Sequence, residues 1–239
     1  MKNTVGLFFL GLFISCGLAA SGYFIGQTMY NAKVALNTAQ AKGLAERRVK
    51  ADRANWTIAF SVASADKAAI PKLYKQSESN QQKIVALLKD NGFEDTEINV
   101  GIIDYNYSEY RDNFGKVSDQ KHTLNGSITI ETQKVDKVSG VRAKINKLIA
   151  EGINISNRDP KYQYTKLNDI KPDMLREATK NARIAANEFA TNAGTQVGGI
   201  RTAHQGSFYI RDAGEDYGDT TKIEKDVRVV TTITFYLTD

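Results

Sequence analysis

One apolar segment near the N-terminus constrains this chain more than any other feature. Residues 4–31 contain no charged side chain, and Val5–Ile25 is almost wholly apolar. As a helix, these 21 residues span about 30 Å, which is the thickness of the hydrocarbon core of a bilayer. We therefore expect residues 1–30 to form a transmembrane signal anchor. Residues 31–42 are polar and rich in alanine, which favours a helical extension or short tether.

The sequence leaves other fates of this segment open. A cleaved signal peptide ends at a small-residue site, and Leu18–Ser21 offers one. Hydrophobicity resumes at Tyr23 without a polar break, which favours an uncleaved anchor. The residues around Cys16 partly resemble a bacterial lipobox, which would instead allow lipidation. Gly22 and Gly26 have the GxxxG spacing through which two anchors can pack closely, although small residues are also common in any such helix.

The remainder of the chain has the composition of a globular domain. The whole sequence is 41% hydrophobic and 25% charged, with three prolines, which does not indicate disorder. Its net charge of +5 comes from 32 basic and 27 acidic residues, so we expect a mixed surface and no nucleic-acid partner. The sole cysteine, Cys16, lies in the apolar segment. The rest of the chain therefore forms no disulfide, thiolate metal cluster or Cys nucleophile, and it suits an oxidising compartment.

Hydrophobic periodicity predicts an α+β fold. From residue 43 onward we expect a single domain, 43–239. Its first part has the order β-α-β-β-α-β, the split pattern of ferredoxin-like units. The expected elements are a strand over Trp56–Val62, a helix from about Pro71 to Asn91-Gly92, strands Ile98–Tyr107 and Lys121–Glu131 joined by a polar connection Ser108–Gln120, a helix from an Asp136 N-cap to Gly152, and a strand Ile153–Thr165.

A long helix and a C-terminal antiparallel strand pair extend this unit. The helix should run from Pro172 to Ala193 and close at Gly194. The strands should cover Thr195–Ile210 and Val227–Leu237, with an acidic loop between them. We expect the buried stripe of the helix to contain Leu175, Ala178, Ala182, Ala185, Ala186 and Phe189.

The search for reaction chemistry finds no candidate catalytic residue and no cofactor-binding motif. The two histidines, His122 and His204, have no carboxylate or second histidine at relay or metal-ligand spacing. No phosphate-binding glycine pattern and no nucleophile elbow occurs. We therefore expect a protein that is not an enzyme. The carboxylates Asp212, Glu215, Asp216 and Asp219 could hold Ca²⁺, but their spacing matches no EF-hand or repeat signature, and a solvated acidic loop explains them without a metal.

Aromatic side chains gather around the expected hairpin tip. Tyr105, Tyr107, Tyr110 and Phe114 lie within ten residues of one another. Exposed aromatic residues on a projecting loop are typical of a protein interface. Tyr105 and Tyr107 share one strand face, so packing within the domain is the alternative.

Several segments, in order along the chain, resemble the SIMPL-domain family, which includes bacterial periplasmic immunogenic antigens. The opening has Gly43, then Asp52 with Ala54 two residues later, running into a strand. Further matches are Leu87-Leu88 with Asn91-Gly92-Phe93, the alanine-rich helix Glu177–Gly194 followed by Val197-Gly198, and the closing strand Val229–Leu237. The resemblance implies an envelope-facing α+β protein that has no catalytic activity and builds large oligomers. It also implies a link to tolerance of oxidative stress.

Two functional hypotheses follow. The leading one is a non-enzymatic, self-associating protein, anchored as a single-pass protein in a bacterial inner membrane with its C-terminal domain in the periplasm. The lipid bilayer and other copies of the chain would be its partners. The alternative is an envelope module that binds a ligand or divalent metal through the acidic loop or the aromatic hairpin tip.

Overall fold

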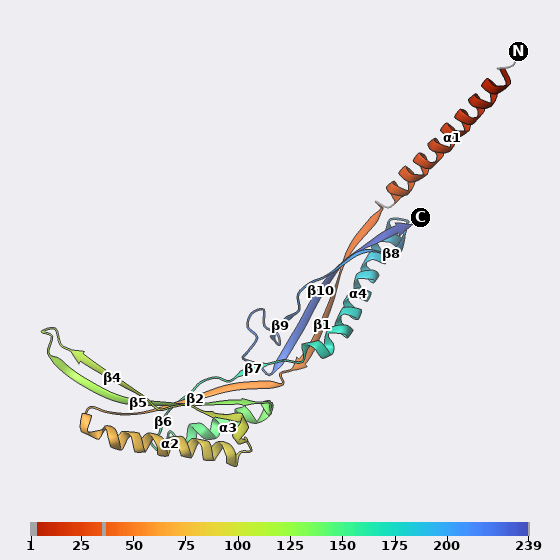
Figure 1. The fold of residues 1–239 in the computed structure, drawn as a ribbon. Coiled ribbons are helices and arrows are strands. Elements are labelled where there is room, and N and C mark those ends of the chain that lie inside the picture. Colours follow the sequence, from red (N-terminus) through yellow and green to blue (C-terminus); the bar gives the residue numbers. More distant parts are fainter. Residues whose placement is uncertain (1–3, 35–36, 239) are drawn as a thin grey trace. The chain divides into compact units, whose positions relative to one another are not determined.

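The computed structural model describes residues 4–34 and 37–238 (Figure 1). The helices are α1 (Thr4–Val34), α2 (Ile70–Asp90), α3 (Val135–Lys147) and α4 (Leu167–Asn192), with short 3-10 helices at Lys67–Ala69 and Asp95–Glu97. The strands are β1 (Thr38–Lys50), β2 (Arg53–Ser64), β3 (Ile98–Val100), β4 (Asp104–Arg111), β5 (Val117–Thr132), β6 (Asn154–Asn157), β7 (Lys161–Gln163), β8 (Gln196–Gln205), β9 (Tyr209–Asp212) and β10 (Glu224–Thr238). The predicted α+β class is confirmed.

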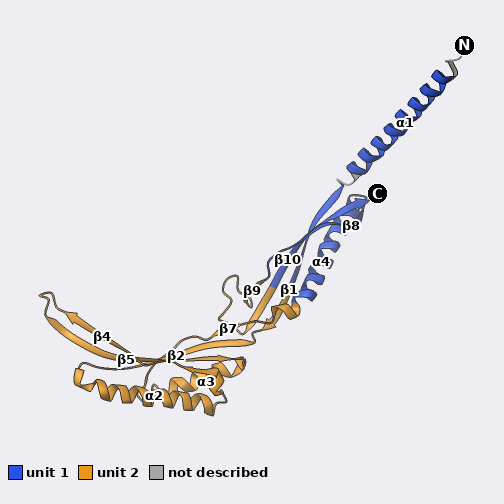
Figure 2. Ribbon diagram, in the orientation of Figure 1, with its two compact units in different colours: residues 1–45, 171–208, 228–239 blue, residues 46–170, 209–227 orange. Residues whose placement is uncertain are grey.

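The chain divides into two compact units (Figure 2). Unit 1 contains residues 1–45, 171–208 and 228–239. Unit 2 contains residues 46–170 and 209–227. The boundary passes through β1 and β10.

The N-terminal helix α1 matches the predicted apolar segment. Within it, Gly6–Ala32 is long and apolar enough to cross a membrane. Of the two alternatives expected over 31–42, a helical extension does not continue through the second half, because β1 begins at Thr38. In β1 the buried side chains alternate and are as small as Ala41 and Ala45, so the strand carries little hydrophobic signal.

Unit 2 contains the predicted split β-α-β topology. Its antiparallel sheet has the order β3-β5-β2-β6, and in addition β4 pairs with β5 and β7 pairs with β2. The long strands β2 and β5 run from the pair Ala54–Thr132 to the pair Ser64–His122. Helices α2 and α3 lie on one face of this sheet (Figure 1). The core between these layers includes Trp56, Ile58, Phe60, Ile84, Leu88, Ile128, Ile130, Val138 and Ile145.

Three predicted boundaries in unit 2 are wrong. The polar connection Ser108–Gln120 is mostly strand, because cross-strand backbone pairing continues to Arg111 and Val117. The predicted strand Ile153–Thr165 is divided into β6 and β7 by a segment that includes Pro160, which lacks a backbone donor. Asp136 lies within the first turn of α3 rather than at its N-cap, where its charge still favours the helix dipole.

Unit 1 places α4 against β1 and β10, with β8 as an edge strand (Figure 2). Helix α4 starts at Leu167, before the predicted first residue Pro172. A proline in an early turn removes one backbone hydrogen bond, and the hydrogen bonds of the following turns outweigh that loss. The buried stripe of α4 is Met174, Ala178, Ala182, Ala186 and Ala190. Phe189 was predicted to be buried but is 63% exposed. The stripe repeats every four residues, and this repeat leaves Phe189 on the flank of the helix.

A close approach of backbones explains the small residues in unit 1. A Cβ atom on Gly43 would lie 1.8 Å from the carbonyl oxygen of Ala178. Ala41, Ile233 and Phe235 complete the apolar contact with α4. The alternation predicted for Val227–Leu237 is confirmed, and it begins two residues earlier, at the buried Lys225.

Candidate interaction surface

The hairpin of β4 and β5 projects beyond the rest of its sheet. Strand β2 pairs with β5 no further than His122, whereas β4 continues to pair with β5 as far as Val117. The end of the hairpin is therefore a two-stranded ribbon (Figure 1). Within the described part of the chain, β4 pairs only with β5, so its other edge is open.

A tight turn over residues 112–116 forms the ribbon tip. The Asp112 carboxylate accepts hydrogen bonds of 2.9 Å from the backbone N–H groups of Phe114 and Lys116. Gly115 has a φ of 79°, which a side chain would disfavour. The turn presents the Phe114 ring at 96% exposure, and Tyr110 beside it is 60% exposed. We name Tyr110 and Phe114 the ribbon tip pair.

Tyr105 and Tyr107 lie at the base of the ribbon and pack on His122. The Tyr105 hydroxyl and His122 Nδ1 share a hydrogen bond of 2.7 Å. The Tyr107 and His122 rings are 4.9 Å apart between centroids. His122 is 4% exposed, and its Nε2 atom has no hydrogen-bond partner among the described residues. Packing within the domain therefore accounts for part of the Tyr105 and Tyr107 surface, as the alternative interpretation expected.

Charged contacts stiffen the ribbon between its base and tip. Glu109 accepts hydrogen bonds from Arg111 at 2.5 Å and from the Tyr107 hydroxyl at 2.9 Å. The Arg111 contact is the main cause that lowers the pKa of Glu109, and the same carboxylate raises the pKa of Tyr107. Arg111 also donates to the carbonyl of Gly115, which ties the strand to the turn. These contacts link β4 to the turn that carries Phe114.

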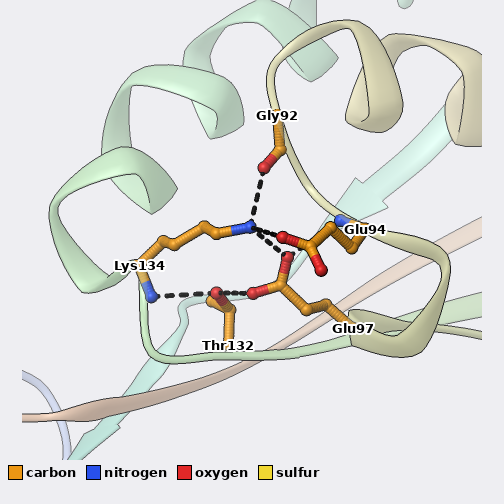
Figure 3. Close-up of polar contacts among 5 residues, drawn as sticks. All are labelled: Gly92, Glu94, Glu97, Thr132 and Lys134. Carbon is orange, nitrogen blue, oxygen red and sulfur yellow. Dashed lines mark hydrogen bonds and ion pairs between the residues drawn. The ribbon is translucent and has the colours of Figure 1, made fainter.

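A second polar cluster, centred on Lys134, joins the loop after α2 to the start of α3 (Figure 3). Lys134 Nζ donates to the Gly92 carbonyl at 3.0 Å, to Glu94 at 2.9 Å and to Glu97 at 2.8 Å. Thr132 Oγ1 donates to Glu97 at 2.6 Å and accepts from the Lys134 backbone N–H at 2.9 Å. A cavity of about 520 Å³ adjoins the cluster.

The electrostatics of this cluster favour a structural clamp. Burial raises the pKa of Glu97, but hydrogen bonds from Lys134 and Thr132 outweigh burial and lower it. The hydrogen bond of Lys134 to Glu97, and after it the one to Glu94, raises the pKa of Lys134. A lysine that acts as a base or nucleophile needs a lowered pKa instead. The cluster therefore ties the loop after α2 to the start of α3.

The acidic loop does not bring its four carboxylates together. Asp212 is buried against the fully buried Lys225 and also accepts hydrogen bonds from the Thr221 N–H and hydroxyl. These contacts outweigh burial and hold the pKa of Asp212 far below its usual range. Glu215 pairs with Lys222 at 2.7 Å. Among residues 4–34 and 37–238 no group of three or more His, Cys, Asp or Glu side chains could hold a metal.

Sequence reasoning missed the buried pair of Asp212 and Lys225. A signal was present, because Lys225 continues the alternation of β10 by one more inward position. Gly22 and Gly26 lie on α1, and a Cβ on either would meet no described atom within 4 Å. Their role in anchor packing remains a prediction.

The motif residues that suggested a family have structural roles. Gly43 permits the close approach of α4. Asp52 accepts hydrogen bonds of 2.7 and 2.8 Å from the Thr165 backbone N–H and hydroxyl. Ala54 is fully buried in the sheet. These positions therefore specify the fold rather than a reaction site.

Three comparisons with known proteins bear on the family of the chain. One solved structure, described as "X-ray crystal structure of a putative amidohydrolase/peptidase from Burkholderia cenocepacia", is 12% identical, with a TM-score of 0.23 over 57% of this chain. The chain spans about a third (35%) of that protein, and so weak a likeness carries no argument. No curated protein matches. The profile of the SIMPL family, described as a protein of unknown function (DUF541), matches residues 40–235. The chain therefore belongs to the SIMPL family.

Proposed function

We propose that this chain is a membrane-anchored envelope protein whose SIMPL domain self-associates and catalyses no reaction. Helix α1 supports the anchor, since its Gly6–Ala32 stretch has the length and composition of a membrane span. In this proposal the anchor is not cleaved, and the C-terminal domain lies outside the cytoplasm, in the periplasm of a bacterium. The absence of cysteine after residue 16 suits that compartment.

The ribbon tip pair is the observation that carries the self-association proposal. Phe114 is 96% exposed, which is costly for an aromatic side chain that has no partner. The adjoining open edge of β4 offers backbone donors and acceptors to another strand. A second copy of the chain supplies a partner of the same kind, as the SIMPL resemblance led us to expect.

The mass of the full-length protein in detergent tests this proposal. We expect an oligomer at micromolar concentration by light scattering with size-exclusion chromatography, corrected for bound detergent. The double variant Tyr110→Ser with Phe114→Ser should shift the population toward monomer. Tyr217→Ser is the matched control, because Tyr217 is 89% exposed in a different loop. A wild-type protein that stays strictly monomeric at this concentration would refute self-association.

A further inference from the structure

One end of unit 1 is tied closely to the membrane anchor. The backbone N–H of Leu237 donates to the Asn37 carbonyl at 2.8 Å, which fixes Asn37 at the end of the sheet. Only residues 35 and 36 separate Val34, the last residue of α1, from Asn37. Three residue steps reach at most about 11 Å. Whatever the direction of α1, Asn37 at the end of the sheet therefore stays within that distance of Val34.

Three segments meet at this end. Strand pairing aligns Leu237 with Val197 and Thr238 with Gln196. Helix α4 ends beside them, because the Thr195 N–H donates to the Ala190 carbonyl at 2.9 Å. We name residues 37–39, 189–198 and 236–238 the anchor-proximal end.

The anchor-proximal end contains no charged side chain. It comprises 16 residues, and a set of this size at the 25% charge of the whole chain would contain about four. Charge returns immediately before it, at Glu188, and at Asp239, which lies outside the described residues. A surface that touches a bilayer must avoid the cost of removing charges from water, and this surface meets that condition.

Phe189 is the most exposed large apolar side chain at this end. Asn181, Ala185 and Phe189 form an i, i+4 row on one flank of α4. Asn181 donates to the Leu44 carbonyl of β1 at 2.8 Å, so this flank faces β1. Gly43 lies against the backbone of Ala178 and Ala182, and Ala41 shares an apolar cluster with Ala182 and Ala186, so α4 and β1 run in opposite directions (Figure 1). Phe189 therefore lies beside the first residues of β1, where the chain leaves the anchor.

We propose that the anchor-proximal end docks on the bilayer surface, with the Phe189 ring inserted at the boundary between headgroups and acyl chains. The inference rests on the proposed membrane anchoring. Phe189 is 63% exposed and Tyr236 is 36% exposed, so both offer apolar surface at this end. Aromatic and apolar side chains of this kind bind the membrane interface. The short connection brings the bilayer within reach, and the lack of charge avoids the cost of removing charges from water.

Quenching by spin-labelled lipids tests the docking in the full-length chain. The protein is reconstituted into nanodiscs of phosphatidylcholine and phosphatidylglycerol, with nitroxides on the headgroup or deep in the acyl chain. A fluorophore is attached at Cys16 in the wild type, or at one new cysteine in a Cys16→Ser background. The new cysteines are Phe189→Cys and, as control, Arg176→Cys. Arg176 is exposed on the same helix, about 20 Å along its axis from Phe189.

The expected result has two parts. Deep nitroxides should quench the probe at Cys16, which reports insertion of α1. Headgroup nitroxides should quench the probe at position 189 about twofold more than the probe at 176, given the shallow depth of interfacial side chains. Equal quenching at 189 and 176 with a deeply quenched Cys16 probe would overturn docking and leave the anchor standing. An unquenched Cys16 probe would overturn both proposals.

Discussion

The two units pack helices on sheets with different side chains. In unit 2, large side chains such as Trp56, Ile58 and Leu88 fill the space between the sheet and the helices, and none is more than 1% exposed. In unit 1, α4 lies on β1 through alanines and through Gly43, with backbone atoms almost in contact. A helix and a sheet thus reach dense packing in two ways: large side chains fill the space between them, or small residues let their backbones approach closely.

This difference predicts how the stability of each unit should change on substitution. A core of large side chains loses stability mainly when atoms are removed, because a cavity remains. An interface of alanine and glycine loses it mainly when atoms are added, because rigid backbone has no room to move. Trp56 is the only tryptophan and belongs to unit 2, so its fluorescence reports on that unit, whereas circular dichroism reports on both.

Gly43→Val should have the largest effect. A Cβ there would overlap the Ala178 carbonyl and the Ala182 backbone nitrogen. We expect a loss of about 4 kcal/mol, at the upper end for single substitutions. Urea unfolding followed by circular dichroism measures it. Gly199→Ala is the control, because a Cβ at Gly199 meets no described atom within 4 Å. A Gly43→Val variant as stable as the Gly199→Ala variant would show that the backbones are not in close contact.

Leu88→Ala should cost about 3 kcal/mol in unit 2, from lost burial and the cavity left behind. Leu88 is fully buried. Unfolding followed by Trp56 fluorescence measures the change. Ala182→Gly provides the comparison in unit 1, where removing one methyl group should cost about 1 kcal/mol, mostly through helix propensity. If the alanine variant lost as much as the leucine variant, the contrast between the units would be wrong.

Asp212→Asn should cost about 2 kcal/mol at neutral pH, because it leaves the buried Lys225 without its anionic partner. The pKa of Asp212 is lowered in the fold, so its contribution is present above the unfolded pKa of about 3.9 and is lost as pH falls toward the folded pKa. Urea unfolding by Trp56 fluorescence at pH 7 and pH 3 checks the sign. The gap between wild type and variant should narrow at pH 3, and a gap that widened there would contradict the ion pair.

The same contrast explains what could be predicted from the sequence. In unit 2, Trp56, Ile58, Phe60 and Val62 alternate clearly, and the order of elements led to the correct topology. In unit 1, β1 was missed because its inward residues are Ala41, Gly43 and Ala45, which carry no hydrophobic pattern. Phe189 was assigned to the core because helical spacing alone did not show that the buried stripe of α4 repeats every four residues and passes through Ala186 and Ala190.

The sequence predicted only part of the candidate surface, for a related reason. The sequence located all four aromatic residues of the hairpin. It offered packing within the domain for Tyr105 and Tyr107 but could not decide it, because their partner His122 lies across the strand pair. The Lys134 cluster also escaped prediction, since Glu94 and Lys134 are 40 residues apart.

The sidedness of the SIMPL domain is the most direct test of the account. A reporter that is active only outside the cytoplasm is fused after Asp239, and a cytoplasm-specific reporter is fused at the same position for comparison. The account predicts activity of the first reporter alone, with the fusion protein retained in the membrane fraction after alkaline washing. Activity of the cytoplasmic reporter would contradict the proposed topology, and an active fusion released into the soluble fraction would contradict the retained anchor.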